Sequence, residues 1–567
     1  MRLLVSLCVL LVSSGISAKE PVAPPVIVNS VAVASAHPYA TATGLQILRD
    51  GGNAFDAAVA VTAVLAVVEP YSSGLGGGGF YLLHRASDDR QVMLDARETA
   101  PLEATRDMYL GEDGKPTSDS LEGPLSAGIP GIPAALAKLA QEYGKLPLKQ
   151  TLAPAIAFAK AGFEVDAHYQ RMASMRLKLL TRDSESARIF LHNKEVPPLG
   201  HLVIQRDLAQ TLGALAEQGR AGFYGGRIAT ALVREVRRNG GIWRLQDLSN
   251  YRVIEREPIS FDYRGWKVTT VAPPSSGGVA LATMFNILEP YDLDSLDEVM
   301  RTHLIVEAMR LAYRDRAEYL GDSDFVDVPV SKLINKSHAA SLRKEWIKEE
   351  IATPSDFLPV ATAESAKGRD TTHFSILDKE GSRVAATLSI NYPFGFGYVA
   401  AGTGVLLNDE MDDFSALPGS PNVYGLIGAE ANSIAPGKRP LSSMSPAFVE
   451  NDQRLAILGT PGGSRIITMV LLGALEFMKG GDAHAIVSKP RFHHQYLPDS
   501  ITYEEDAISE DAHWELGIMG HQFSERMGSY GEENPVYGNM QAVTLDKLTG
   551  EVSAASDPRV SGIAGVR

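Results

Sequence analysis

Two adjacent threonines stand ahead of a strand-like run, in Asp370-Thr371-Thr372-His373-Phe374-Ser375. An internal threonine hydroxyl is a poor nucleophile because nothing deprotonates it. If the chain is cut before Thr371, the new α-amine, whose ordinary pKa is near ~8, can accept the hydroxyl proton around neutrality. Thr371 would then supply both nucleophile and base. Taken alone the pattern is weak, because paired threonines at the start of a strand are ordinary β-propensity.

Four carboxylates follow an apolar run in Leu407-Asn408-Asp409-Glu410-Met411-Asp412-Asp413-Phe414. A solvated acidic loop is the commonest explanation of such a stretch. Calcium is the usual rival, but the spacing does not match an EF-hand loop. The carboxylates could instead bind a substrate ammonium group.

A glycine turn, Pro461-Gly462-Gly463-Ser464-Arg465, is predicted between a strand at Arg454–Gly459 and a helix at Ile466–Met478. A glycine turn at a helix N-terminus presents backbone N–H groups of the kind that stabilise an oxyanion, although most such turns are only connectors. Upstream, Pro418–Gly425 opens a loop that ends at Lys438–Pro446, and the Pro and Gly content of this stretch predicts an ordered surface loop or a lid.

A hairpin would position Thr371. Two alternating runs, Thr371–Leu377 and Arg383–Asn391, flank the loop Lys379-Glu380-Gly381. If Gly381 is left-handed, Asp378 pairs with Ser382, and this register places Ser389 opposite Thr371. The alternation then puts Ser389 and Asn391 on the face of Thr371. Because Pro393 cannot donate a ladder hydrogen bond, the strand should end there.

The rest of the chain reads as a mixture of helices and strands. The Ala- and Val-rich run Asn53–Val68 predicts a buried helix, and a membrane span is the alternative that Asp56 and the short length disfavour. The glycines of Gly74–Gly79 lack the ending of a phosphate loop, so close backbone packing or a tight turn is their expected use. Residues Ile351–Asp370 have no periodicity and resemble a surface linker that tolerates cleavage. Further helices are expected at 132–143, 208–218, 279–288 and 303–319, and a strand at 266–271.

Composition and the first residues limit the classes of binding partner and the cellular compartment. The chain has 567 residues with a formal net charge of −15, which argues against nucleic acid or an anionic membrane as the main partner. Residues 1–18 have the basic start, apolar centre and small-residue end of a secretory signal, while the apolar run is too short for a stable membrane span. The only cysteine, Cys8, lies inside that segment, so the mature protein would have no disulfide and no cysteine-based metal site.

Five stretches in the same order and spacing closely resemble the γ-glutamyltranspeptidases, and the resemblance spans nearly the whole mature chain. These stretches are Leu94-Asp95-Ala96-Arg97-Glu98-Thr99-Ala100-Pro101, Thr371-Thr372-His373, the acidic run 407–414, Arg439-Pro440-Leu441-Ser442-Ser443-Met444-Ser445-Pro446 and the glycine turn 461–465.

The resemblance implies an α+β fold, the αββα sandwich of N-terminal-nucleophile hydrolases, made as a precursor that cleaves itself. Cleavage between Asp370 and Thr371 would follow removal of the signal at 1–18. It would leave a large subunit, 19–370, and a small catalytic subunit, 371–567, as a heterodimer that shares one core. We therefore expect a residue from each side of the cleaved bond to meet at the site.

The implied activity is that of a γ-glutamyltransferase and glutathione hydrolase. Thr371 would attack the γ-carbonyl of glutathione or another γ-glutamyl compound, giving a γ-glutamyl ester that water or an amino-acid or peptide acceptor resolves. The resemblance implies no cofactor and no metal, and a periplasmic or secreted location.

The remaining roles implied by the resemblance fall on single residues. Ser389 stands where the family commonly has Thr and would orient the nucleophile; Gly462 and Gly463 would form the oxyanion hole; Arg97, Ser442 and Ser443 would hold the α-carboxylate; Asn391, Glu410 and Asp413 would hold the α-ammonium; Tyr424 would belong to the lid.

Alternatives remain open at this point. Arg97 could instead form a surface salt bridge with Glu98. Tyr392-Pro393 departs from the commoner polar or small residues, which puts the acceptor-side contacts in doubt. At the level of function, an acylase for glutaryl or other side-chain amides and a non-catalytic amino-acid or peptide-binding protein are the rivals. Cephalosporin-type acylases have less use for the Asp413 carboxylate, so its presence favours γ-glutamyl substrates.

Overall fold

A computed structural model describes residues 28–355, 371–524 and 538–567. The expected signal at 1–18, most of the expected linker and Asp370 lie outside the described residues. Thr371 is the first described residue after the gap at 356–370.

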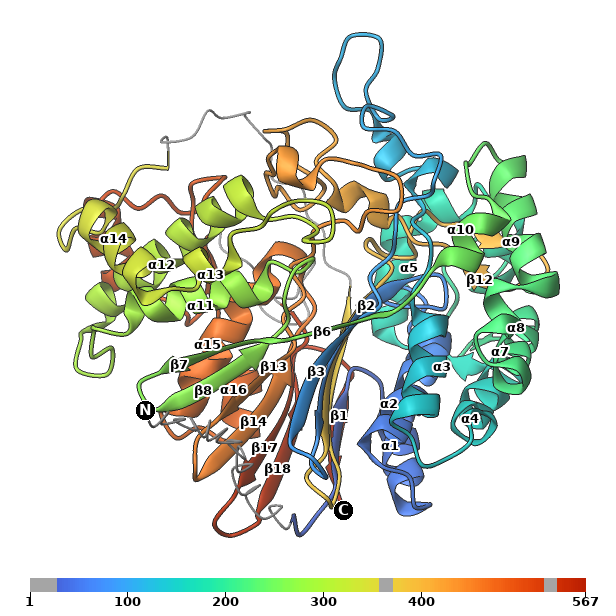
Figure 1. The fold of residues 1–567 in the computed structure, drawn as a ribbon, viewed down its shortest axis with the longest axis horizontal. Coiled ribbons are helices and arrows are strands. Elements are labelled where there is room, and N and C mark those ends of the chain that lie inside the picture. Colours follow the sequence, from blue (N-terminus) through green and yellow to red (C-terminus); the bar gives the residue numbers. More distant parts are fainter. Residues whose placement is uncertain (1–27, 356–370, 525–537) are drawn as a thin grey trace, which may run out of the picture.

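Two antiparallel β-sheets lie face to face in the centre of the molecule (Figure 1). The first sheet has the order β19-β1-β9-β10-β2-β3-β6, and the second has the order β18-β17-β14-β13-β8-β7. The strands of the first sheet are β1 (Ala32–Ser35), β2 (Gly78–Arg85), β3 (Arg90–Asp95), β6 (Ile254–Arg256), β9 (Thr372–Leu377), β10 (Arg383–Ser389) and β19 (Ile563–Val566). Those of the second are β7 (Ile259–Tyr263), β8 (Trp266–Thr270), β13 (Ala447–Glu450), β14 (Arg454–Gly459), β17 (Gln541–Asp546) and β18 (Val552–Ser556). Three short pairs complete the strands, namely β4 (Phe163–Glu164) with β5 (Leu202–Val203), β11 (Val399–Ala400) with β12 (Val405–Leu406), and β15 (Phe492–His493) with β16 (Thr502–Tyr503).

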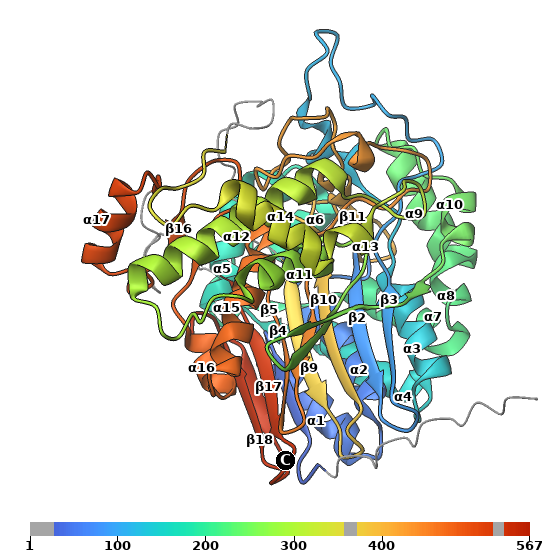
Figure 2. The same ribbon diagram turned by 60° about the vertical axis from the view of Figure 1, so that its left-hand side comes forward.

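Helices cover the outer face of each sheet (Figures 1 and 2). The layer on the first sheet contains α1 (Pro38–Arg49), α2 (Ala54–Val68), α3 (Ile132–Glu142), α4 (Leu148–Ala161), α5 (Ala167–Leu180), α6 (Ser184–Phe190), α7 (Arg206–Gln218), α8 (Ala221–Tyr224), α9 (Gly226–Arg238) and α10 (Leu245–Asn250). The layer on the second contains α11 (Gly277–Leu288), α12 (Glu298–Tyr319), α13 (Val330–Leu333), α14 (Lys336–Trp346), α15 (Ile466–Met478) and α16 (Ala483–Ser488), with α17 (Glu510–Ile518) at the periphery. Between the sheets, apolar side chains of both pack together, among them Leu82, Leu377, Phe448 and Ile457. The expected αββα sandwich is confirmed, and both sides of the gap at 356–370 contribute strands to one core.

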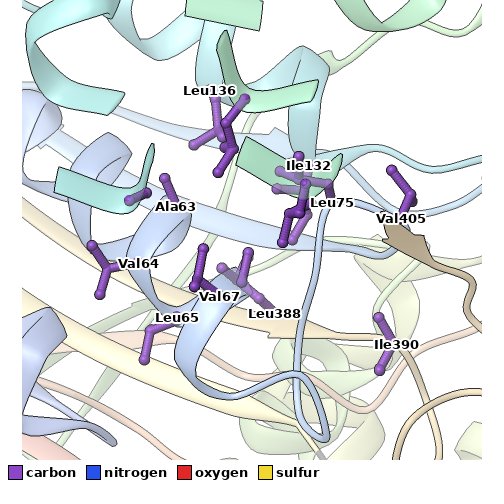
Figure 3. Packing of buried hydrophobic residues seen from close by; sticks show 14 of the residues in the cluster. Ala63, Val64, Leu65, Val67, Leu75, Ile132, Leu136, Leu388, Ile390 and Val405 are labelled. Atoms are coloured by element: carbon purple, nitrogen blue, oxygen red, sulfur yellow. The ribbon is translucent and has the colours of Figure 1, made fainter. Parts of the chain in front are cut away.

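Helix α2 packs against strands β9 and β10 on the outer face of the first sheet. Asn53 caps its N-terminus and forms a capping box with Asp56, which satisfies N–H groups that a helix start leaves unpaired. Every residue of α2 is buried, and Val64 and Val67 lie in the same apolar cluster as Leu388 of β10 (Figure 3). The prediction of a buried helix is confirmed. Among the residues that the structure describes, no helix is long and apolar enough to cross a membrane.

The hairpin β9–β10 has the predicted register. Gly381 is left-handed with φ 87°, the Asp378 N–H donates to the Ser382 carbonyl at 3.0 Å, and Leu388 pairs with Thr372. The predicted end of the second strand was wrong. β10 stops at Ser389, because Asn391 adopts a positive φ of 71° and its N–H turns back to the Ser389 hydroxyl at 2.8 Å.

The glycine-rich loop before β2 is used for close backbone packing, as expected. A Cβ on Gly76 would lie 1.9 Å from the Leu406 carbonyl oxygen, and one on Gly77 would lie 2.1 Å from that of Ser389. A larger residue in place of Gly77 would force the loop away from the end of β10, beside Thr371, and one in place of Gly76 would force it away from β12.

Candidate active site

A narrow pocket lies where β9 begins and β10 ends. Its lining contains every expected site residue that the structure describes except Arg97 and Gly462, together with Met444 and Ile466, while Asp370 lies outside the described residues. The expected residues on the lining are Thr371, Ser389, Asn391, Glu410, Asp413, Tyr424, Ser442, Ser443 and Gly463. The pocket is small, with about 260 Å³ of empty space that includes its opening to solvent.

Thr371 is placed by the first residues of β9 and is 6% exposed. Its Oγ1 donates to the Ser389 Oγ at 3.4 Å, so the hairpin register brings the two hydroxyls together as predicted. The neighbouring Thr372 faces the opposite side, where its hydroxyl donates to the Glu69 carboxyl at 2.8 Å. Burial raises the pKa of Glu69 to about 8, so this carboxyl holds its proton at neutral pH.

Arg97 follows β3 and is fully buried. Its guanidinium forms ion pairs with Glu410 and Asp413 of the short helix η3 (Glu410–Asp413). It also donates from Nε to the Pro440 carbonyl at 3.2 Å. The alternative of a surface salt bridge with Glu98 is wrong in its location, because the two side chains do form an ion pair at 3.7 Å but both are fully buried. Residues from both sides of the predicted cleavage point thus meet here.

The acidic stretch is not a solvated loop. Asp409, Glu410 and Asp412 are all buried, and Asp413 is nearly so. Burial raises the pKa of Glu410 to about 7, with Arg97 acting in the opposite direction, and raises that of Asp412 to about 6. Burial by itself would lower the pKa of Arg97, but the surrounding carboxylates outweigh it and hold the pKa above the ordinary value. Arg97 is therefore paired with several carboxyl groups in a buried site, where charges interact more strongly than in water.

Three buried polar atoms on the pocket lining have no hydrogen-bond partner among the described residues. They are the Asn391 Oδ1, the Glu410 Oε2 and the Ser443 Oγ. Leaving a buried polar atom unpaired typically costs ~1–3 kcal/mol, so such atoms point to a missing partner. Two of the three can only accept hydrogen bonds when Glu410 is ionised, which suits a ligand that carries an ammonium group.

Tyr424 closes the pocket from the loop Pro418–Gly425. Its hydroxyl donates to the Asn391 carbonyl at 2.8 Å. Its ring lies directly on the glycine turn, because a Cβ on Gly463 would be 2.3 Å from the Tyr424 Cδ1. The loop therefore covers the glycines that the sequence indicated for an oxyanion, in the position that the predicted lid would take.

The glycine turn has the predicted neighbours, β14 at Arg454–Gly459 and α15 at Ile466–Met478. Gly462 and Gly463 have φ values of 140° and 57°, a conformation that other residues adopt only with strain. The short helix η5 (Gly463–Arg465) leads from this turn into α15. Gly463 shares the pocket lining with Thr371, so the turn lies beside the candidate nucleophile.

Sequence reasoning missed residues that do not line the pocket but contact the segments that form it. Asn408 donates to the carbonyls of Gly76 and Gly128 at 2.6 and 2.8 Å and so ties the glycine loop to the acidic stretch. Burial and the nearby Glu410 carboxylate raise the pKa of Glu98 well above its usual range. Arg176 donates to the Pro393 and Gly395 carbonyls and lies 4.7 Å over the Tyr392 ring. Adjacency to Arg97 was the only sequence signal for Glu98, and Arg176 had none.

One group of described residues has the side chains of a metal site, namely His303, Glu307 and His521, and none of them lines the pocket. The His303 Nδ1 and His521 Nε2 already share a hydrogen bond at 2.8 Å, and the Arg310 Nε lies 3.3 Å from the Glu307 carboxylate. These contacts favour a hydrogen-bonded link between α12 and the residues after α17 over a metal centre.

Comparison with known proteins agrees with this geometry. The sequence model of the gamma-glutamyltranspeptidase family matches residues 40–566. The glutathione hydrolase proenzyme of Escherichia coli (strain K12) is 41% identical over 551 residues, covering 95% of this chain and 94% of that protein. Among solved structures, cephalosporin acylase from Bacillus halodurans has a TM-score of 0.81 at 26% identity and covers 98% of this chain and 99% of its own. The gamma-glutamyltranspeptidase of Helicobacter pylori has a TM-score of 0.56 at 39% identity and covers 57% of this chain and 94% of its own.

Proposed function

The chain belongs to the γ-glutamyltranspeptidase family and is a glutathione hydrolase and γ-glutamyltransferase, and on that premise we propose which of its residues carry the reaction. The nucleophile is Thr371, released as an N-terminus by cleavage after Asp370. The observation that carries this proposal is the meeting of Thr371, Ser389 and Gly463 on one pocket with the acids that Arg97 holds.

Maturation and turnover use the same hydroxyl. In the precursor, the Thr371 Oγ attacks the Asp370 carbonyl, the peptide bond becomes an ester, and water releases the two chains, 19–370 and 371–567. The freed α-amine then takes the hydroxyl proton when the Oγ attacks a γ-glutamyl amide, and passes it to the departing amine. Water or an amino acid next attacks the γ-glutamyl ester and restores the threonine. The Gly462 and Gly463 amides stabilise the oxyanion of each step.

The substrate's α-amino acid end occupies the charged part of the pocket. Its α-carboxylate pairs with Arg97 and accepts hydrogen bonds from Ser442 and Ser443. Its ammonium binds to Asp413, Glu410 and Asn391. There it donates hydrogen bonds to the Asn391 Oδ1 and the Glu410 Oε2, which have no partner among the described residues. In the structure Arg97 pairs with Glu410 and Asp413 themselves, so a zwitterionic substrate exchanges these internal ion pairs for its own.

An acylase acting on glutaryl amides is the second candidate, because the cephalosporin acylase of Bacillus halodurans shares the fold over nearly the whole chain. A glutaryl group has the carboxylate but lacks the ammonium, and it would leave the oxygens of Glu410 and Asn391 unpaired. The acidic lining therefore favours γ-glutamyl compounds.

Assay of γ-glutamyl and glutaryl p-nitroanilides tests this choice. We expect kcat/KM to favour the γ-glutamyl anilide by at least tenfold, about 1.4 kcal/mol. Preference for the glutaryl anilide would overturn the substrate assignment. We further propose that the protein is exported after removal of residues 1–18, which N-terminal sequencing of the mature large chain tests.

A further inference from the structure

Asn422 lies in the lid and contacts the proposed ammonium site. Its Oδ1 accepts hydrogen bonds from the Tyr424 and Leu426 N–H groups at 3.0 and 3.1 Å, which fixes the turn of the lid. Its Nδ2 donates to the Asp413 Oδ1 at 2.9 Å. The amide orientation follows from these partners, because only the NH₂ can face a carboxylate and only the oxygen can face two N–H groups.

The two oxygens of Asp413 therefore have different partners. Oδ2 pairs with Arg97, and Oδ1 accepts from Asn422. A zwitterionic substrate that takes Arg97 for its carboxylate frees Oδ2 for its ammonium. The Oδ1 contact lies on the other side of the carboxylate and need not break. Asn422 thus holds the Asp413 carboxylate in one orientation while its other oxygen changes partner.

The adjacent acid attaches the lid differently. The Asp412 Oδ2 accepts from the Val423 N–H at 2.9 Å, and its Oδ1 accepts from the Ser120 hydroxyl at 2.7 Å. Asp412 does not line the pocket, whereas Asp413 does. Of these two attachments, only the one through Asn422 reaches a residue proposed to bind substrate.

We propose that Asn422 is a positioning residue that orients Asp413 for the substrate ammonium. This inference rests on the proposed function, in which Asp413 binds the ammonium. It assigns to the lid a part in recognising the amino group, in addition to covering the glycine turn through Tyr424.

The variant Asn422→Asp separates the two roles of the side chain. It keeps an oxygen for the Tyr424 and Leu426 N–H groups, so the lid turn is retained. It replaces the donor to Asp413 with a second carboxylate, and like charges at this distance oppose ionisation of both. We expect KM for γ-glutamyl p-nitroanilide to rise at least tenfold with kcat changed less than threefold, and the kinetics of the glutaryl anilide to stay within about twofold of wild type. If glutaryl turnover is too slow, inhibition constants for L-glutamate and glutarate give the same comparison.

Ser120→Ala is the matched control, because it removes a hydrogen bond to Asp412 and leaves the Asn422–Asp413 contact intact. We expect it to change both substrates alike and by less than threefold. If Asn422→Asp lowers kcat/KM equally for both substrates, Asn422 has only a structural role and the inference is overturned. Unchanged kinetics for both substrates would also overturn it. If Asn422→Asp fails to mature, Asn422→Ala removes the donor without adding a charge, and the same comparison of substrates decides.

Asp413→Asn distinguishes failure of this inference from failure of the proposed function. If that variant lowers γ-glutamyl binding selectively but Asn422→Asp does not, only the role of Asn422 is refuted. If Asp413→Asn treats both substrates alike, Asp413 does not bind the ammonium, and both proposals fall together.

Discussion

The Thr371 Oγ1 lies 3.4 Å from the Ser389 Oγ, across the end of a hairpin whose register is set by a three-residue loop at Gly381. The Ser389 Oγ also accepts the Asn391 N–H at 2.8 Å, so this one hydroxyl touches both the candidate nucleophile and the turn that ends β10. Ser389 is therefore placed to hold Thr371 in a fixed rotamer.

Removing the Ser389 hydroxyl should slow both maturation and turnover. We expect Ser389→Ala to lower each rate by roughly 10- to 100-fold, because the nucleophile loses an orienting partner. Ser389→Thr keeps the hydroxyl and restricts its rotamers, so it should keep or increase both rates. Time courses of precursor cleavage on denaturing gels and kcat for a γ-glutamyl anilide measure the two steps. Unchanged rates in Ser389→Ala would show that the contact has no role in orientation.

Arg97 should affect stability as well as substrate binding. Arg97→Ala leaves Glu98, Glu410 and Asp413 without their shared cation, and removing one partner of a buried pair typically costs ~3–5 kcal/mol. Arg97→Lys keeps the charge but loses the bidentate geometry. We expect the Lys variant to mature normally with KM raised at least tenfold, and the Ala variant to melt several degrees lower. If KM in Arg97→Lys equals that of wild type, bidentate binding of the substrate α-carboxylate by Arg97 is excluded.

A methyl group on Gly463 should displace the lid and strain the glycine turn. The added Cβ would meet the Tyr424 ring at 2.3 Å, and the φ of 57° disfavours alanine. We expect Gly463→Ala to lower kcat by about 10²-fold, within the range for loss of one oxyanion donor. In the double variant Gly463→Ala/Tyr424→Ala the clash is removed but the turn stays strained. We therefore expect kcat of the double variant to be about tenfold higher than that of Gly463→Ala. No recovery in the double variant would show that the lid clash contributes nothing.

The buried Glu69 gives the protein a pH-dependent stability. Burial raises its pKa to about 8 in the folded chain, so its favourable contribution is complete below the ordinary carboxyl pKa and is lost as pH rises through about 8. Glu69→Gln keeps an acceptor for Thr372 and cannot ionise. The melting temperature of this variant relative to wild type should therefore increase by a few degrees between pH 5 and pH 9. A flat profile for Glu69→Gln would contradict the assignment.

Local rules were enough to predict the elements that carry the site. Periodicity and turn residues gave β14 and α15 with their observed bounds, and the left-handed Gly381 gave the register that pairs Leu388 with Thr372. The end of β10 was missed because the proline rule considers only ladder donors. The strand ends earlier, where Asn391 takes a positive φ.

The charged part of the site depends on contacts that no local pattern encodes. Arg97 meets Glu410 and Asp413 across more than 300 residues of sequence. Only the family resemblance suggested that these segments come together, and it did not indicate that they pair with one another in the structure. The burial of Glu98 depends on the backbones of Gly78 and Gly128, which pack against its side chain.

Intact-mass analysis of wild type and Thr371→Ala, expressed and purified in parallel, shows whether Thr371 both cleaves the precursor and carries turnover. We expect two polypeptides for wild type, the smaller beginning at Thr371, and a single uncleaved chain without γ-glutamyl turnover for the variant. A wild-type protein that stays in one piece yet turns over substrate would contradict this expectation, as would a Thr371→Ala protein that is cut at the same bond.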